Sequence, residues 1–161
     1  MRLSVQTPVV ERSLPAGFTV RSLAGECEVE TYVALHRAVF ESKSMTIAWR
    51  ARTLRHPDYR ADLDLVAVAP DGRLAAFCIG WLDTHLEPDI RGQIEPLGVH
   101  PDFRHLGLGR AILSEGIRRL HLHGAEHIYV ETDNYRNAAL ELYESVGFRV
   151  IRDVWVYRKD Y

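Results

Sequence analysis

The sequence predicts a single α/β domain, which can equally be classed as α+β, with a mixed sheet and helices on both of its faces. Its 161 residues, 47% hydrophobic and 26% charged, have the length and composition of one globular domain. Two apolar runs, residues 63–69 and 74–83, flank the turn Pro-Asp-Gly-Arg and predict a β-hairpin. From residue 92 onward, strand and helix patterns alternate, which favours a parallel strand pair.

The first half of the chain contributes the elements around this hairpin. Residues 1–15 alternate polar and apolar residues without a long apolar stretch and are expected to form a loose N-terminal arm, so the domain covers residues 16–161. Apolar residues near 3.6 spacing favour two helices between the first strand and the hairpin. The expected elements are a strand at 17–22, helices at 25–42 and 45–54, and a further strand at 92–99 after the hairpin.

The second half carries two helices with clear apolar faces. The first follows the loop after Pro101 and runs to about Leu122, and the second ends at Gly147. A strand lies between them and another follows them. The expected ranges are 126–132 and 148–158 for the strands and 135–147 for the second helix. Because a helix joins the strands 92–99 and 126–132, we expect these two strands to be parallel.

Composition excludes several classes of function. A net charge of −2 gives no bulk attraction for nucleic acid or for an anionic membrane, so neither is expected as a partner. The only cysteines, Cys27 and Cys78, are far apart, so neither a disulfide framework nor a metal site is expected. No apolar run approaches the roughly 20 residues of a spanning helix. These features predict a cytoplasmic protein.

The loop at residues 104–110, which precedes the helix that runs to about Leu122, has the features of an anion-binding site. Backbone N–H groups at a helix start have no carbonyl partners, and Gly107 and Gly109 let a phosphate approach them closely. Arg104 and Arg110 add positive charge, so the expected ligand is a pyrophosphate. The third glycine of a dinucleotide fingerprint and the lysine of a P-loop are both absent. A nucleotide-binding module and a helix start without a ligand remain as alternatives.

Two stretches resemble the GNAT superfamily of N-acetyltransferases. The first is IEPLGVHPDFRHLGLGRAIL, residues 94–113, which is particularly similar to the acetyltransferase domains of mycothiol-synthase-like proteins. The second is NAALELYESVGF, residues 137–148. The resemblance covers residues 17–158 and implies a mostly antiparallel central sheet in which one parallel strand pair splays apart. It also implies acetyl-CoA as co-substrate, with no metal.

The resemblance assigns the residues that would hold acetyl-CoA. The loop and helix start would wrap the pyrophosphate, the strand before them would contact the pantetheine and acetyl groups, and the Val99 N–H would polarise the thioester carbonyl. The position of the usual motif asparagine is Arg136 here, and Asn134 is expected to reach the pantetheine instead. The cofactor-binding residues expected are Leu97, Gly98, Val99, Arg104, His105, Leu106, Gly107, Leu108, Gly109, Arg110, Asn134, Ala139 and Tyr143.

Pro96 supports the splayed pair independently. It lies inside a strand expected to be central, where a residue without an N–H would interrupt the hydrogen-bond ladder. Such a proline is tolerated at a bulge. In the resembled family this strand is bulged, and the gap beside it admits the pantetheine arm.

Tyr143 and Glu95 are the expected catalytic residues. The resemblance implies that Tyr143 protonates or hydrogen-bonds the departing thiolate, whereas a core tyrosine is the alternative. Glu95 would take a proton from the acceptor amine, directly or through water, and Glu131 and His100 are rival bases. The predicted helix at 45–54 carries Trp49, Arg50 and Arg52, which either line the acceptor cleft or pack internally.

The sequence therefore predicts an acetyl-CoA-dependent N-acetyltransferase in which a primary amine attacks the thioester directly. The acceptor is expected to be a small-molecule or peptide amine of unknown identity, and a homodimer is a reasonable assembly. The alternative is a non-catalytic acyl-CoA-binding regulatory domain.

Overall fold

A six-stranded sheet of order β1-β6-β5-β4-β3-β2 lies at the centre of a computed structural model that describes residues 1–4, 13–84, 89–133 and 136–153. Every neighbouring pair is antiparallel except β5 and β6, which are parallel as expected. The strands are β1 (Arg2–Ser4), β2 (Thr19–Ser22), β3 (Asp64–Val68), β4 (Leu74–Asp83), β5 (Arg91–Val99) and β6 (His127–Tyr129).

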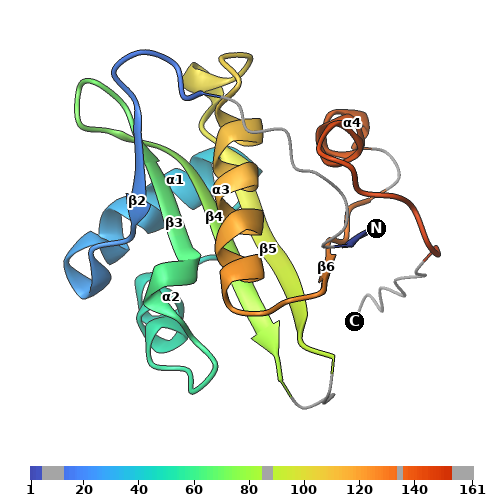
Figure 1. The fold of residues 1–161 in the computed structure, drawn as a ribbon. Helices are drawn as coiled ribbons and strands as arrows, with labels where there is room; N and C mark the ends of the chain where they lie inside the picture. Colours follow the sequence, from blue (N-terminus) through green and yellow to red (C-terminus); the bar gives the residue numbers. More distant parts are fainter. Residues whose placement is uncertain (5–12, 85–88, 134–135, 154–161) are drawn as a thin grey trace, which may run out of the picture.

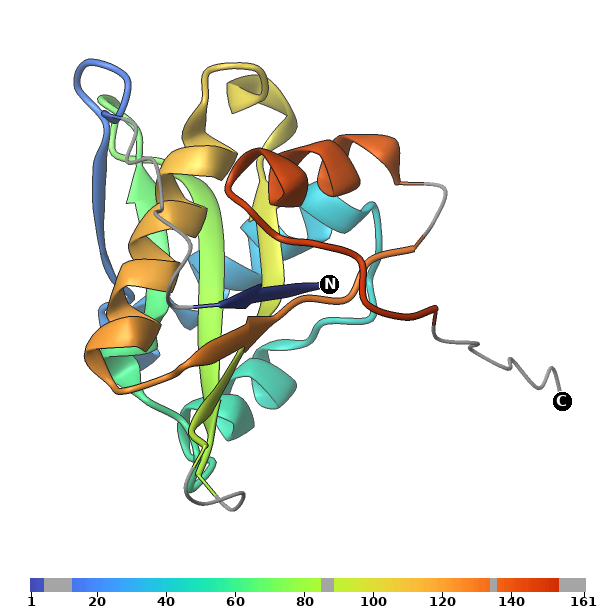
Figure 2. The same cartoon turned by 45° about the vertical axis from the view of Figure 1, so that its right-hand side comes forward.

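Helices cover both faces of this sheet (Figure 1). One face carries α3, and the opposite face carries α1 and α2. The fourth helix, α4, packs against the same core as α3 and lies beside the start of α3 (Figure 2). The helices are α1 (Val29–Phe40), α2 (Ile47–Leu54), α3 (Leu108–Leu122) and α4 (Asn137–Ser145), with the short 3-10 turns η1 (Gly25–Glu28), η2 (Ala61–Leu63) and η3 (Pro101–Phe103).

The alternation of side chains along β3 and β4 builds a core on each face of the sheet. Leu65 and Cys78 pack with Ile117 of α3, whereas Val66 and Phe77 belong to the cluster beneath α1. These strand residues are fully buried because helices cover both sides of the sheet. The hairpin predicted at 63–69 and 74–83 is therefore confirmed as β3 and β4.

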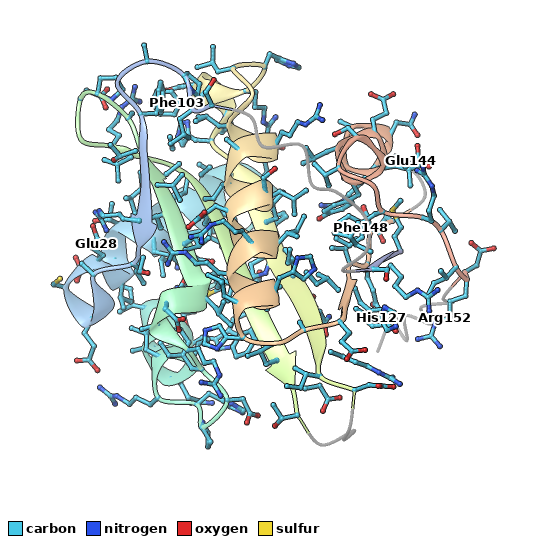
Figure 3. The ribbon with its side chains drawn as sticks, viewed as in Figure 1. Glu28, Phe103, His127, Glu144, Phe148 and Arg152 are labelled. Atoms are coloured by element: carbon cyan, nitrogen blue, oxygen red, sulfur yellow. The ribbon has the colours of Figure 1, made fainter. Side chains whose placement is uncertain are left out.

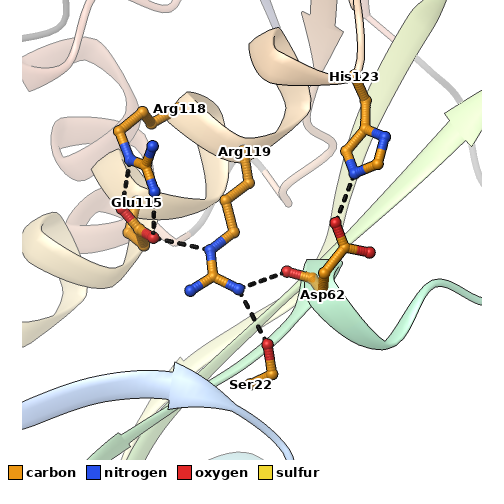
Figure 4. A network of polar contacts seen from close by, with 6 residues as sticks. All are labelled: Ser22, Asp62, Glu115, Arg118, Arg119 and His123. Carbon is orange, nitrogen blue, oxygen red and sulfur yellow. Dashed lines mark hydrogen bonds and ion pairs between the residues drawn. The ribbon is translucent and has the colours of Figure 1, made fainter.

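Polar contacts fix the C-terminal end of α3 to the rest of the domain (Figure 4). Glu115 pairs with Arg119 at 2.7 Å, and Arg119 also donates to the Asp62 carbonyl and the Ser22 hydroxyl. His123 Nε2 lies 2.5 Å from Asp62 Oδ2. The network joins α3 to η2 and to the edge strand β2.

Two expectations about the chain ends are wrong in the described residues. Arg2–Ser4, expected in a loose arm, pairs with β6 as an edge strand, because β6 would otherwise leave its ladder groups unpaired. The strand expected over 148–158 is reduced, in the part that is described, to a single bridge between Arg149 and Arg2. Residues 154–158 of that expectation lie outside the described residues.

Phe148 takes the place of that strand in the core. It is fully buried beneath α4 (Figure 3). Its ring meets Tyr143 edge to face, with centroids 5.7 Å apart. The segment after α4 thus contributes an aromatic anchor.

Candidate active site

The parallel pair β5 and β6 separates after three residues. Arg91, Gly92 and Gln93 pair with β6, but β5 continues to Val99 while β6 ends at Tyr129. In Figure 2, β6 leaves β5 and passes beneath α4. Beyond Gln93, no described strand pairs with β5 on this side, which confirms the splayed strand pair.

A bulge in β5 accompanies the separation. Cys78 pairs with Leu97 and Gly80 pairs with Ile94, so Glu95 and Pro96 together stand opposite one residue of β4. Pro96 therefore lies where the ladder is already interrupted, as its missing N–H requires. The bulge changes the direction of the last part of β5 relative to β6.

The end of β5 has a backbone N–H donor, that of Val99, on the side from which β6 has separated. The His100 N–H donates to the Ala75 carbonyl of β4, so the Val99 carbonyl on the same peptide points away from β4. In a strand, the N–H and C=O of one residue point to the same side, so the Val99 N–H also points away from β4, toward the side where β6 has separated from β5. An extended ligand arm could pair there as an added strand does.

Gly98 shows why this strand end has so small a residue. A Cβ placed on Gly98 would lie 2.5 Å from Val39 Cγ1 and 2.7 Å from Phe77 Cζ. The C-terminal end of α1 therefore packs directly on the strand backbone. On the other face, Leu97 and Val99 are half-buried and pack against the core beneath α3, as do Ala139 and Leu142 of α4.

The loop before α3 presents unpaired N–H groups next to this strand end. Among the described residues, no backbone or side-chain acceptor takes the N–H groups of Gly107, Leu108, Gly109 or Arg110. Gly107 has φ +85° and His105 has φ +63°, and a Cβ on Gly107 would meet open space. This is an anion-binding geometry at the positive end of a 15-residue helix.

The two arginines beside the loop are held differently. Arg110 Nη2 donates to the Ser145 carbonyl of α4 at 3.0 Å. Arg104 is exposed and reaches the carbonyls of Val99 and Val39 at 3.4 Å, which are long hydrogen bonds. Arg104 therefore spans the surface between the loop and α1.

Tyr143 is a buried residue of α4. It is 6% exposed, and burial raises the pKa of its hydroxyl to about 12. Its hydroxyl makes no hydrogen bond with any described residue. A neutral hydroxyl of this kind is available as a donor to a ligand.

The three candidate bases occupy different surroundings. Glu95 is exposed at the bulge, where its Oε2 accepts from Gln93 Nε2 at 2.8 Å. Glu131 lies beyond β6, close enough to the Met1 ammonium to raise the pKa of that amine, although burial lowers it more. His100 Nδ1 accepts the Asp102 N–H and caps η3.

The predicted helix residues around Trp49 separate into two groups. Arg50 is buried and forms an ion pair with Asp64, which also accepts from Tyr59 at 2.7 Å, so Arg50 packs internally. Trp49 is 52% exposed, and Arg52 is exposed.

Asn134, which was expected to reach the pantetheine, lies outside the described residues.

Sequence reasoning missed two residues that contact Glu95, namely Gln93 and Trp81. Trp81 Nε1 donates to the Glu95 carbonyl oxygen at 2.8 Å. The period of two along β5 places Gln93 and Glu95 on one side and could have indicated the first contact. The second depends on the register of β4 against β5, which no local pattern reveals.

Across the described residues, no helix combines the length and the apolar character that crossing a bilayer requires. Within the same residues, no three His, Cys, Asp or Glu side chains gather as metal ligands would.

Solved structures of N-acetyltransferases superpose on this fold. A GCN5-related N-acetyltransferase from Sphaerobacter thermophilus superposes with a TM-score of 0.77 at 20% identity, over 91% of this chain and 45% of that one. The structure of AAC(6')-Iy, in complex with a bisubstrate analog, superposes with a TM-score of 0.71 at 17% identity, over 89% and 98%.

Residues 28–148 match the model of the acetyltransferase (GNAT) family, and the chain belongs to this family. It is 37% identical over 147 residues to a mycothiol acetyltransferase of Kineococcus radiotolerans, covering 88% of this chain and 46% of that protein. It is 30% identical over 155 residues to the mycothiol acetyltransferase of Salinispora tropica, covering 92% and 50%. The chain thus spans about half the length of these curated relatives.

Proposed function

We propose that this chain transfers an acetyl group from acetyl-CoA to a primary amine. The observation that carries the proposal is the open edge of β5 beside the uncapped start of α3. A diphosphate at the loop and a pantetheine arm along Val99 would occupy one continuous path between these two features. The relatives named as acetyltransferases support the same chemistry.

The reaction is a direct attack. The acceptor ammonium, with an ordinary pKa near 10, first loses one proton to solvent. The amine nitrogen forms a bond to the thioester carbon, and negative charge develops on the carbonyl oxygen beside the Val99 N–H. The new bond makes the nitrogen acidic, so its second proton passes to Glu95. The C–S bond then breaks, and the products are an N-acetylated amine and the CoA thiolate.

Tyr143 assists the departing sulfur chiefly as a hydrogen-bond donor. A thiol has an ordinary pKa near 8.5, below the pKa of about 12 that burial gives Tyr143. Complete proton transfer from the phenol to the thiolate would therefore run uphill. The thiolate is stabilised by the hydroxyl while it leaves and takes its proton from solvent.

Glu95 is the base that the geometry favours. It lies at the bulge, on the strand that ends at Val99, whereas His100 is occupied in capping η3 and Glu131 lies near the chain's amino group. Replacement of Glu95 by Gln keeps the side-chain shape and removes the base. We expect it to shift the rising limb of the pH–rate profile, and an unmoved limb would point to Glu131 or to titration of the free amine.

The acceptor is proposed to be a small-molecule or peptide amine. AAC(6')-Iy was solved with a CoA-acetylneamine analog, and several relatives are mycothiol acetyltransferases, so small amines are favoured. The cytoplasm is the proposed compartment, because Cys27 and Cys78 are both free. A homodimer stays a prediction.

The test is thiol release from acetyl-CoA in the presence of a panel of amines. The panel contains aminoglycosides, peptides with a free N-terminus and simple primary amines. Release that requires an added amine supports the proposed function. Tight binding of CoA without release for any amine would support the acyl-CoA-binding regulatory domain instead, and binding of NAD or ATP in place of CoA would support a nucleotide-binding module.

A further inference from the structure

Glu95 is held at two points by neighbouring side chains. The Trp81 indole N–H donates to its backbone carbonyl, and Gln93 Nε2 donates to its carboxylate, each at 2.8 Å. One contact fixes the main chain at the bulge and the other fixes the end of the side chain. Both donors come from the paired ends of β4 and β5, where Trp81 stands opposite Gln93.

The bulge explains why such contacts are needed. Glu95 and Pro96 together face one residue of β4, so the regular ladder does not continue through them. Pro96 has no N–H to contribute. The indole N–H supplies a donor to the Glu95 carbonyl at the place where the ladder is interrupted.

Trp81 is itself held in place. Its ring packs against the cluster beneath α1 that contains Phe77 and Ile79. His56 meets it edge to face, with ring centroids 6.4 Å apart. The indole is therefore a fixed donor rather than a surface side chain that samples many rotamers.

The carboxylate needs its own restraint because Glu95 is exposed. A free glutamate side chain has three rotatable bonds, and an acceptor amine would meet it in many positions. The amide of Gln93 selects one of these positions. Ile94 packs in the core with α3, so Gln93 and Glu95 both face the side of the sheet that carries α1 and α2.

We propose that Trp81 and Gln93 are positioning residues that hold the Glu95 carboxylate for the acceptor amine. The inference rests on the proposed function, because it assigns these residues to the proton-transfer step. Neither residue belongs to the α3 loop or to the end of β5 at Val99, where acetyl-CoA is proposed to bind. Their loss is expected to lower turnover and to leave the binding of CoA unchanged.

The test is a set of single and double variants. Trp81→Phe keeps an aromatic ring and removes the N–H, and Gln93→Met keeps the side-chain length and removes the donor. Each is expected to lower kcat about tenfold, as small displacements of a catalytic group do. The KM for acetyl-CoA and the CoA affinity are expected to stay within about twofold, because the cradle at α3 is untouched.

The decisive measurement repeats both changes in a Glu95→Gln background. If Trp81 and Gln93 act through the carboxylate, neither change lowers the remaining rate further, since the group they hold is already absent. A full additional loss in that background would overturn the proposal. Gln93→Met keeps the test valid if Trp81→Phe unfolds, because Gln93 is a partly exposed strand residue.

The same experiment separates this inference from the proposed function. A wild-type chain that binds CoA and releases no thiol with any amine overturns both. An active wild-type chain whose rate is unchanged by Glu95→Gln overturns the inference and leaves acetyl transfer standing. Lower activity in Glu95→Gln together with wild-type rates in Trp81→Phe and Gln93→Met also overturns the inference alone.

Discussion

Arg110, in the first turn of α3, donates from Nη2 to the carbonyl oxygen of Ser145 at the end of α4, 3.0 Å away. The contact joins the helix that follows the anion-binding loop to the helix that carries Tyr143. The packing agrees with this link, because a Cβ on Gly109 would touch Leu142 at 3.4 Å. The helix that follows the loop proposed to bind the diphosphate and the helix that carries Tyr143 are therefore in direct contact.

The two loop arginines should respond differently to replacement. Arg104→Ala is expected to weaken CoA binding by about 1.5–3 kcal/mol, the range for a hydrogen bond to a charged group. Arg110→Ala should in addition lower the free energy of unfolding by about 1 kcal/mol, because it removes the contact with Ser145. Calorimetric titration with CoA and urea unfolding measure the two effects, and an unchanged CoA affinity in Arg104→Ala would remove that residue from the site.

Gly72 serves as the control for Gly107, because the two glycines have the same backbone conformation. Gly107 and Gly72 have φ +85° and +86°, and a Cβ on either would meet no atom within 4 Å. Alanine at each should therefore destabilise the fold equally, by about 1–2 kcal/mol for a left-handed residue. Only Gly107→Ala should weaken CoA binding, because only its methyl group would enter the space above the α3 start. Equal CoA affinities in the two variants would contradict the assigned cradle.

Tyr143→Phe should lower kcat more than it changes the affinity for CoA. The change removes the hydroxyl and keeps the ring that packs on Phe148. Because burial raises the pKa of Tyr143 to about 12, the hydroxyl stays protonated through neutral pH and adds no limb to the rate profile there. Steady-state kinetics between pH 6 and 9 measure both points. A normal kcat would return Tyr143 to the role of a core residue.

Glu115 should make stability depend on pH in the acidic range. Its hydrogen bonds to Arg118 and Arg119 lower the pKa of the carboxyl from 4.5 to about 2 (Figure 4). A lowered pKa contributes stability that is present above pH 4.5 and is lost as the pH falls through 2. Glu115→Gln should therefore cost about 1 kcal/mol at pH 7, because solvent partly screens these charges.

The cost of Glu115→Gln should shrink toward zero near pH 2, where the wild-type carboxyl also loses its charge. Urea unfolding at the two pH values measures the difference. Glu30→Gln, at an exposed position of α1, serves as the matched control. Equal costs of Glu115→Gln at both pH values would show that its contribution is not electrostatic.

Local patterns were sufficient for most of the secondary structure. Leu74–Asp83 was predicted at its observed bounds, because an apolar run next to a Pro-Asp-Gly turn leaves few alternatives. The helix predicted to run to about Leu122 likewise ends there, as α3. Failures fell at the chain ends, where three residues at Arg2–Ser4 became a strand only because β6 offered a partner. Such short pairing carries no local period to detect.

The sequence by itself determined which functional residue types are present. These are the glycines and arginines of the α3 loop, the proline that interrupts β5, and the tyrosine on α4. These are local properties of backbone freedom, charge and side-chain type. Only the tertiary structure decided which of them meet. The register of β4 against β5 places Trp81 on Glu95, and the early end of β6 leaves the Val99 N–H facing a gap. Contacts between residues distant in sequence depend on how whole helices and strands pack together. A short segment of the sequence carries no information about that packing.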